Sequence, residues 1–456
     1  MRKVWTLRVV SVFFVMFLFV SSSVAMEYDV GGKKLYILGS MEQYARFGGH
    51  GTNYNPTGDY ATGGAYKGLM GSFYSLNTRQ HLIWSDNLEF RTAFRLEGDY
   101  AVYEVNKDSS DWAELKESKH NMEIDDDFDE ILRECNVGYF SRKLNLRIGK
   151  QTVAWGQTDL FRLMDMINPI DYRRMYILRD SDYGYQESRV PTWIAKVEYF
   201  PEVSVGPVSG IGLEFIWTPE TESRTLFNIG PRNGGVWAFP VPYDMPPGLR
   251  DLNIYDRRKA RNFENSTLAF RFKGNWGNTF LTLNAFYGWS DMPVLTRSRD
   301  NPGMIYGVAN GGNIGDGPGY GLDLDMVYHR KPVLGFTVSR EMDFIRPLVQ
   351  AIGQVANPTF RIESYYRFNK PFSTDWIERI KSGAASPADS GVEFEKRDVL
   401  RYMVGFDWPL RVSWLNSRKQ FFTSFQFLHA HTIHSGDFWE APYHCKSPGI
   451  SMILPA

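Results

Sequence analysis

The chain has few cysteines, almost no net charge and, beyond its first 25 residues, no long apolar segment, and each of these absences excludes a class of protein. Only two of its 456 residues are cysteines, Cys135 and Cys445, which excludes a disulfide-rich scaffold and a cysteine-based metal site. Its 51 basic and 52 acidic residues leave a formal charge of −1, so nucleic acid is not expected as a partner. Beyond residue 25, no stretch approaches the roughly 20 apolar residues of a membrane-spanning helix. No motif predicts a catalytic residue, a cofactor or a metal ion, and the chain is not expected to be an enzyme.

The chain begins with a segment that resembles a targeting signal. Basic residues precede an apolar run at 9–20, and Ser23-Val24-Ala25 suits signal-peptidase cleavage before Met26. An uncleaved membrane anchor is the alternative, although the apolar run is short for a helical span. Residues 1–25 are therefore predicted to be a signal peptide.

The strongest pattern in the remaining sequence is an alternation of apolar and charged residues. Over 88–103 it has a period of two, which predicts a strand with two chemically opposite faces. Its length exceeds the roughly five or six residues of an ordinary strand and suits the nine to eleven or so of a tilted membrane crossing. The apolar positions are Leu88, Phe90, Phe94, Leu96, Tyr100 and Val102, and the charged positions between them are Glu89, Arg91, Arg95, Glu97 and Asp99.

The alternation recurs, and short and long connections alternate between the strands. This combination is typical of an antiparallel transmembrane β-barrel with periplasmic turns and long extracellular loops. The fold class is therefore predicted to be all-β, with about 13–14 strands over 26–436. If short and long connections alternate along the whole chain, residues 320–341 must form one long, bent strand. The expected strands are 34–44, 70–84, 88–104, 131–140, 144–152, 190–200, 209–218, 266–273, 278–289, 320–341, 359–368, 399–408 and 419–430.

These thirteen strands are an odd number, whereas single-chain bacterial barrels nearly always have an even number. Residues 437–456 contain three prolines and no sustained alternation, and proline removes a ladder donor. We therefore expect an irregular tail at 437–456 and a C-terminally truncated barrel. The alternative is a further strand hidden within 437–454.

One segment carries a recognisable motif. Residues 147–157 read Arg-Ile-Gly-Lys-Gln-Thr-Val-Ala-Trp-Gly-Gln, and 166–174 read Met-Ile-Asn-Pro-Ile-Asp-Tyr-Arg-Arg. They resemble the signature of domain-of-unknown-function family 1302, whose members are uncharacterised proteobacterial outer-membrane barrels. The resemblance implies an outer-membrane location, and it includes a hydrophobic or lipid-like solute among the candidates.

The chemistry of the motif suits a loop that folds back into the barrel and narrows it. Glycines permit close approach, a tryptophan can anchor a strand end, and Asn168-Pro169 stops any helix. A well-ordered extracellular loop is the alternative. The residues of this signature, which we treat as a candidate loop anchor, are Arg147, Gly149, Gln151, Trp155, Gly156, Asn168, Pro169 and Asp171.

The charged residues of the alternating strands are predicted to line the lumen. Their mixture of signs predicts ion pairs that brace a polar interior, with contact to a solute as the alternative. The candidate lumen-lining residues are Arg91, Arg95, Glu97, Asp99, Lys196, Glu198, Arg271, Lys273, Arg361, Glu363, Arg401 and Asp407.

Together these observations predict a porin-like transport protein of the bacterial outer membrane, a channel or export/uptake protein for a solute. The expected partners are outer-membrane lipid and the outer-membrane assembly machinery, with an inner-membrane exporter or a periplasmic protein as a further candidate. An outer-membrane hydrolase resembling a lipase and a surface β-sandwich binding protein are the alternatives.

The orientation of the barrel is testable by cysteine labelling of intact cells in a background without Cys135 and Cys445. An impermeant reagent should label cysteines at Asn233 and Gly312, in long loops, and should spare a cysteine at Asp86, in a short turn. Labelling at 86 but not at 233 would reverse the topology.

Overall fold

The computed structural model describes part of the chain. The described residues are 24–48, 68–99, 128–158, 162–171, 188–219, 249–257, 263–290, 293–298, 320–373, 394–414, 420–433 and 449–453. Within these ranges, no helix is both long and apolar enough to cross a membrane. Asn233 and Gly312 lie outside the described residues, as do residues 1–23 of the expected signal peptide.

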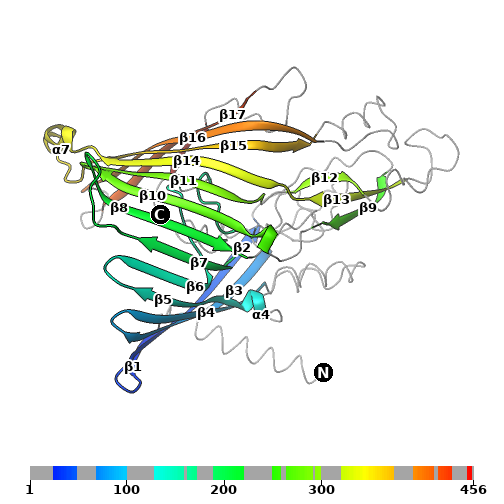
Figure 1. The fold of residues 1–456 in the computed structure, drawn as a ribbon, viewed down its shortest axis with the longest axis horizontal. Coiled ribbons are helices and arrows are strands. Elements are labelled where there is room, and N and C mark those ends of the chain that lie inside the picture. Colours follow the sequence, from blue (N-terminus) through cyan, green and yellow to red (C-terminus); the bar gives the residue numbers. More distant parts are fainter. Residues whose placement is uncertain are drawn as a thin grey trace.

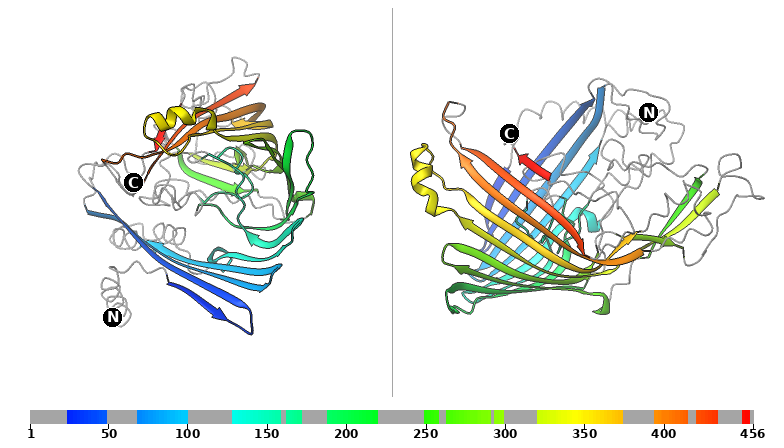
Figure 2. Two further views of the ribbon diagram at one scale, coloured as in Figure 1. Left: turned by 90° about the vertical axis from the view of Figure 1, so that its left-hand side faces the viewer. Right: turned by 90° about the horizontal axis from the view of Figure 1, so that it is seen from above.

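The described residues form one large antiparallel sheet of 15 strands that curls around an interior (Figures 1 and 2). Every neighbouring pair in this sheet is antiparallel, so the all-β, antiparallel prediction is confirmed. Within the described residues, the edge strands β1 and β18 pair only with β2 and β17. In order across the sheet, the strands are β1 (Val24–Asp29), β2 (Lys34–Gly48), β3 (Gly68–Ser85), β4 (Leu88–Asp99), β5 (Leu132–Phe140), β6 (Leu144–Gln151), β7 (Thr192–Tyr199), β8 (Val208–Thr218), β10 (Thr267–Trp276), β11 (Thr279–Trp289), β14 (Arg330–Glu341), β15 (Thr359–Ser373), β16 (Phe394–Leu410), β17 (Phe421–Ile433) and β18 (Gly449–Ile453).

Twelve of the thirteen expected strands are present, the remaining one, 320–341, is divided into two strands, and the structure adds β1 and β18 to the main sheet. β18 corrects the expectation of an irregular tail, because residues 449–453 pair with β17. This strand has five residues and lies between Pro448 and Pro455. Its alternation is too short to stand out in the sequence, and its pairing depends on the exposed edge of β17.

A smaller sheet of three strands lies beyond one end of the main sheet (Figure 1). It corrects the expectation of one strand over 320–341, because the chain leaves the strand conformation at 328–329. β14 then pairs with β11 in the main sheet, while β13 pairs with β9 and β12. The small sheet consists of β9 (Leu249–Asp256), β12 (Val294–Arg297) and β13 (Tyr320–Val327).

The described helical elements are short. They are α4 (Phe128–Ile131), η2 (Phe263–Asn265), η3 (Asp343–Ile345) and α7 (Arg346–Ala351). Two of them, η3 and α7, occupy the connection 342–358 between β14 and β15. That connection lies at the end of the sheet where the sequence predicts short turns, and it is longer than its neighbours.

The other connections at this end are shorter. Gly277 and Asn278 alone join β10 to β11, and Gly277 has a φ of 55°, which glycine adopts without strain. The tight turn Asp86-Asn87 joins β3 to β4. The long loops expected from the sequence leave the opposite end of the sheet, so the predicted alternation of short and long connections holds except at 342–358.

The two faces of the sheet differ as the alternation predicts. Apolar side chains project from the convex face, and most of their strand neighbours on the concave face are buried and polar. This arrangement leaves a wide apolar band on the outside of the sheet. Exposed convex-face residues include Phe90, Leu96, Phe270, Leu283, Phe336 and Phe427, and buried concave-face residues include Arg95, Glu97, Thr282, Asn284, Thr337 and Gln426.

We expect Leu283→Arg to impair assembly into membranes. Leu283 is 59% exposed on β11 and its strand neighbours are Phe272 and Phe336. A cation on the lipid face of a barrel at mid-bilayer costs about 2–4 kcal/mol. Heat-modifiable gel migration after insertion into vesicles measures the folded fraction.

The control for this prediction is His81→Arg on the concave face, where Glu89 lies 2.7 Å from the imidazole and can pair with the new guanidinium. Alternation alone would offer Ala93 as the control, but Ala93 is only 5% exposed and has little room for a longer side chain. Equal assembly of L283R and H81R would contradict the assignment of faces.

Candidate functional site

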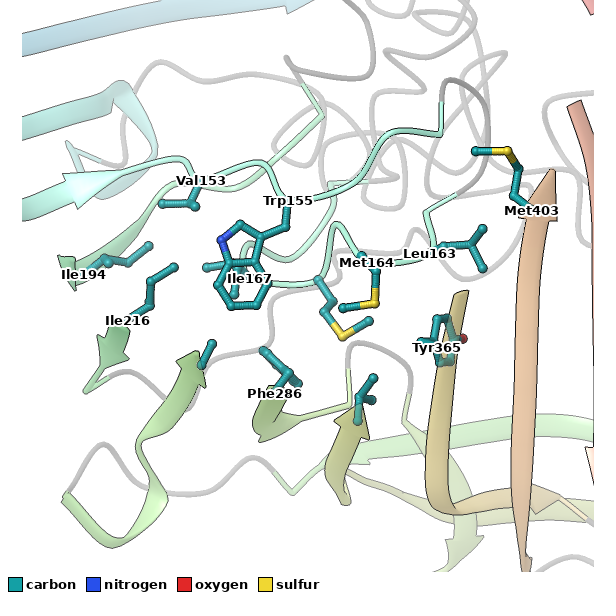
Figure 3. Packing of buried hydrophobic residues seen from close by; sticks show 13 residues of the cluster. Val153, Trp155, Leu163, Met164, Ile167, Ile194, Ile216, Phe286, Tyr365 and Met403 are labelled. Atoms are coloured by element: carbon teal, nitrogen blue, oxygen red, sulfur yellow. The ribbon is translucent and has the colours of Figure 1, made fainter. Parts of the chain in front are cut away.

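The segment that follows β6 folds onto the concave face of the sheet instead of extending away from it (Figure 3). We call residues 152–158 and 162–171 the inward segment. Its apolar side chains join a cluster with side chains from seven strands, β7, β8, β10, β11, β14, β15 and β16. The cluster contains Val153, Trp155, Leu163, Met164, Met166 and Ile167 from the segment, and Ile194, Ile216, Ala269, Phe286, Val333, Tyr365 and Met403 from the sheet.

The sheet residues of this cluster break the rule that concave positions are polar. They occupy the same face as buried charges, yet they are large and apolar because the inward segment covers them. Burying such a side chain contributes about 1.5–3 kcal/mol. Gly335 shows how close the contact is, because a Cβ there would lie 2.3 Å from the sulfur of Met164.

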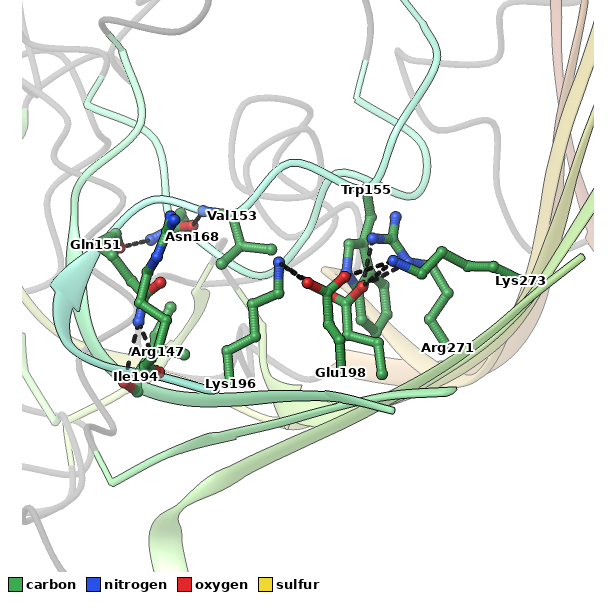
Figure 4. A network of polar contacts seen from close by, with 11 residues as sticks. Arg147, Gln151, Val153, Trp155, Asn168, Ile194, Lys196, Glu198, Arg271 and Lys273 are labelled. Atoms are coloured by element: carbon green, nitrogen blue, oxygen red, sulfur yellow. Dashed lines mark hydrogen bonds and ion pairs between the residues drawn. The ribbon is translucent and has the colours of Figure 1, made fainter. Parts of the chain in front are cut away.

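Asn168 ties the two ends of the inward segment together. Its side chain is fully buried, and its Oδ1 accepts a hydrogen bond from the backbone N–H of Val153 at 2.7 Å. Its Nδ2 lies within 3.1–3.2 Å of three acceptors, namely the carbonyl oxygens of Gln151 and Val190 and the hydroxyl of Thr192. One amide thus joins the end of β6, the segment and the start of β7 (Figure 4).

Trp155 anchors the middle of the segment to a buried carboxylate. Its indole N–H donates to Glu214 on β8 at 2.8 Å, and the Arg271 guanidinium lies 5.1 Å from the centre of its ring. Arg271 and Lys273 of β10 reach the same carboxylate at 2.5 and 3.1 Å. Lys196 of β7 is 3.9 Å away (Figure 4). Glu214 is completely buried, so these cations compensate a charge that would otherwise be strongly unfavourable.

Glu363 on β15 holds the far part of the segment. Its two carboxylate oxygens accept the backbone N–H groups of Gln157 and Met164, each at 2.5 Å. Arg361 donates to the Gln157 carbonyl oxygen and forms an ion pair with Asp407 of β16. Two side chains of β15 therefore satisfy both the donors and the acceptor of one short piece of irregular backbone, and β16 supplies the counter-ion of one of them.

Gly156 lies where the segment crosses this carboxylate. A Cβ at Gly156 would lie 3.0 Å from the Cβ of Asp165 and 3.3 Å from the Oε1 of Glu363. Asp165 itself accepts a hydrogen bond from Arg189 at 2.8 Å. The small residue permits the two halves of the segment to approach each other.

The end of the segment pairs with the chain that leads into β7. The backbone N–H of Asp171 donates to Ser188, and the carbonyl oxygen of Pro169 accepts from Val190. Ile170 and Arg189 form an isolated bridge. Arg173 and Arg174, the last two residues of the motif, lie outside the described residues.

Two further signature residues shape the end of β6. Gly149 has a φ of 131°, and a Cβ there would lie 2.2 Å from the carbonyl oxygen of Cys135. Only glycine fits this backbone. The amide of Gln151 donates to the carbonyl oxygens of Ile194 and Arg147, at 3.1 and 3.3 Å. The side chain of Arg147 lies elsewhere, 3.5 Å from Glu89.

The structure places most of the candidate lumen-lining charges in ion pairs on the concave face. Arg95 pairs with Glu97 and Arg91 with Glu89. Lys273 is 2.5 Å and Lys196 is 3.5 Å from Glu198. Of these four contacts, only Lys273–Glu198 joins different strands, β10 and β7, and the other three lie within a single strand. The side chain of Asp99 lies outside the described residues.

Sequence reasoning missed Glu214, Lys331 and Lys370. Glu214 had a signal, because it is the only charge among the mainly apolar residues 208–218 of β8. Lys331 was missed because residues 329–332, His-Arg-Lys-Pro, resemble a hairpin turn. Lys370 was missed because a bulge in β15 changes which residues face inward. Within the described ranges, no group of three or more His, Cys, Asp or Glu side chains could hold a metal ion.

Comparison with known proteins finds a family model that matches the region of the motif. The family model described as "Protein of unknown function (DUF1302)" matches residues 134–206, from β5 through the inward segment to the end of β7. The resemblance seen in the motif is confirmed. Among curated proteins the sequence finds no match. Among solved structures it is similar to an anion-selective porin from Comamonas acidovorans, at 10% identity and a TM-score of 0.34, over 87% of this chain and 79% of that chain.

We expect Asn168→Ala to lower the free energy of unfolding by about 2–4 kcal/mol, because it leaves several buried backbone groups without partners. Denaturant unfolding in detergent micelles measures this change. The control is Asn278→Ala in the β10–β11 turn, where the side chain makes one exposed hydrogen bond to Asp343. The control should stay within about 0.5 kcal/mol of the parent. A loss at Asn168 no larger than at Asn278 would refute the role of Asn168.

Proposed function

We propose that this chain is a β-barrel channel of the bacterial outer membrane, in which the inward segment narrows the lumen. The observation that carries the proposal is the fixed position of this segment. It is held on the concave face by Asn168, by the Trp155–Glu214 contact and by Glu363. A loop fixed inside a barrel reduces the cross-section open to solutes.

The convex face supports a membrane location. Its apolar side chains form a band across the sheet that water would not favour, whereas hydrocarbon would. The antiparallel sheet satisfies its backbone hydrogen bonds between strands, as a membrane-spanning sheet must. In this setting outer-membrane lipid and the assembly machinery of that membrane are the partners.

The concave face favours a hydrophilic solute over the lipid-like solute that the family resemblance suggested. His81, Arg91 and Arg147 are partly exposed there. The large apolar side chains of the concave face are instead covered by the inward segment. A lipid-like solute would need an apolar path, and the apolar side chains of this cluster are already in contact with the segment.

The hydrolase alternative gains no support from the described histidines. His81 contacts Glu89, and the ring of His329 packs against Phe394. His429 and His431 lie beside each other on the convex face of β17. The other four histidines lie outside the described residues.

Conductance in a planar lipid bilayer tests the proposal. The purified chain should form channels, and Glu363→Ala should raise the single-channel conductance, because it removes the acceptor of two backbone N–H groups that hold the inward segment. The control is Glu341→Ala, which removes a half-exposed carboxylate at the last residue of β14, away from the inward segment. Absence of channels would overturn the proposal, and equal conductance of E363A and E341A would overturn the constricting role of the segment.

A further inference from the structure

Exposed apolar side chains gather on the connection 342–358 between β14 and β15. This connection contains η3 and α7 and lies at the turn end of the sheet (Figure 1). Phe344, Leu348 and Ile352 follow one another at intervals of four residues, the spacing that places side chains on one side of a helix. They are 65%, 63% and 55% exposed, and Val355 is 72% exposed. Single exposed apolar residues are ordinary, but a group of them marks an interaction surface, and we call these four the apolar patch.

The connection is held against the convex side of the sheet. The indole N–H of Trp408 donates to the carbonyl oxygen of Ala356 at 2.9 Å. Trp408 belongs to the convex face, because it is the strand neighbour of Asp407 on the concave face. Arg340 also projects from the convex face, and its guanidinium lies 5.9 Å from the ring centre of Phe344. The apolar patch is therefore attached on the side of the sheet that carries the apolar band.

Further hydrogen bonds fix the connection to neighbouring turns. The side chain of Gln354 accepts from the backbone N–H of Arg411 at 2.7 Å and donates to the carbonyl oxygen of the same residue at 3.1 Å. Asn278 of the β10–β11 turn donates to Asp343 at 2.8 Å. Three connections at the turn end thus hold one another, and the apolar patch has a defined position.

The convex face gives the reason to place this patch in a membrane. At the turn end, aromatic side chains of other strands are exposed on that face, namely Tyr139 of β5 (43%) and Tyr199 of β7 (44%). Trp and Tyr are enriched at membrane–water interfaces, where their rings lie at the level of the lipid headgroups. Trp408, which contacts the connection, lies toward the same end of β16. The apolar patch therefore continues the apolar band at the level of the headgroups.

Arginines flank the apolar patch. Arg346 begins α7 with a side chain that is 59% exposed, and Arg411 is exposed in the connection that follows β16. With Arg340 they make three cations, against the two carboxylates Glu341 and Asp343. The surface around the patch thus has an excess of positive charge. A guanidinium presents its donors in the geometry that phosphate requires, so these side chains complement phospholipid headgroups.

We propose that the connection 342–358 binds the phospholipid surface of the periplasmic leaflet. The apolar patch enters the boundary between headgroups and acyl chains, and the arginines contact the phosphates. Apolar side chains with basic neighbours bind membrane interfaces in this way. The inference goes beyond the channel function and rests on it only for the membrane location and the orientation. If a periplasmic protein were the occupant instead, the patch would stay in water when the chain is alone in vesicles.

The first experiment measures the depth of the patch in vesicles of phosphatidylcholine and phosphatidylglycerol. A fluorescent probe is attached to a single cysteine, introduced as Leu348→Cys in a full chain without Cys135 and Cys445. Brominated lipids should quench this probe strongly. The control is Asp86→Cys in the exposed β3–β4 turn at the same end of the sheet, where quenching should be much weaker because the turn lies in water.

A third probe, at Leu283→Cys on the convex face of β11, separates this inference from the channel function. Quenching at 283, with quenching at 348 no stronger than at 86, would overturn the membrane contact of the connection and leave the barrel standing. Absence of quenching at 283 would overturn the barrel itself, and with it the inference.

The second experiment tests the arginines with the probe at 348. Brominated phosphatidylglycerol diluted in phosphatidylcholine should quench more than the same fraction of brominated phosphatidylcholine. The local excess of the anionic lipid should be about fivefold, the attraction expected of one arginine near an anionic surface, and R346Q/R411Q should abolish it. The control R142Q removes an arginine that is 84% exposed at another turn and should keep the excess. Equal quenching by the two brominated lipids in the parent, or the same loss in R142Q, would overturn the contact with phosphates.

Discussion

The inward segment depends on one constraint, which is that irregular backbone placed against the inside of a sheet must find hydrogen-bond partners there. Strands satisfy each other, but this segment belongs to no strand, so side chains must supply what it needs. Asn168 satisfies groups at both of its ends, and Glu363 accepts two of its N–H groups. An unsatisfied buried group would cost about 1–3 kcal/mol, so these few side chains fix the conformation.

The buried carboxylates that hold the segment must in turn be compensated by cations, because an unpaired buried charge is strongly unfavourable. Glu214 accepts the indole N–H of Trp155 and is surrounded by Arg271, Lys273 and Lys196. These contacts join β7, β8 and β10 into one support. The buried charges around the inward segment are therefore balanced by partners within the sheet.

The fold was largely predictable because alternation is a local property. A sustained period of two indicates both a strand and its two faces, and twelve of the thirteen expected strands were found in this way. The strands β1 and β18 are only six and five residues long, so the pattern had too few positions to be detected. The separation of β13 from β14 depends on which strand each meets, and β13 meets β9 from far along the chain.

For the candidate site, the sequence by itself determined the motif and its glycines. It also determined that the charged residues of each alternating strand share one face. It left open whether the segment after β6 extends outward or folds inward. Only the tertiary structure decided this, because the answer depends on contacts between residues such as Gln157 and Glu363, which lie far apart in the chain. The orientation of Lys370 was likewise decided in three dimensions. A single extra residue in β15 reverses the alternation, and its place is set by the pairing with β16 rather than by any residue nearby in sequence.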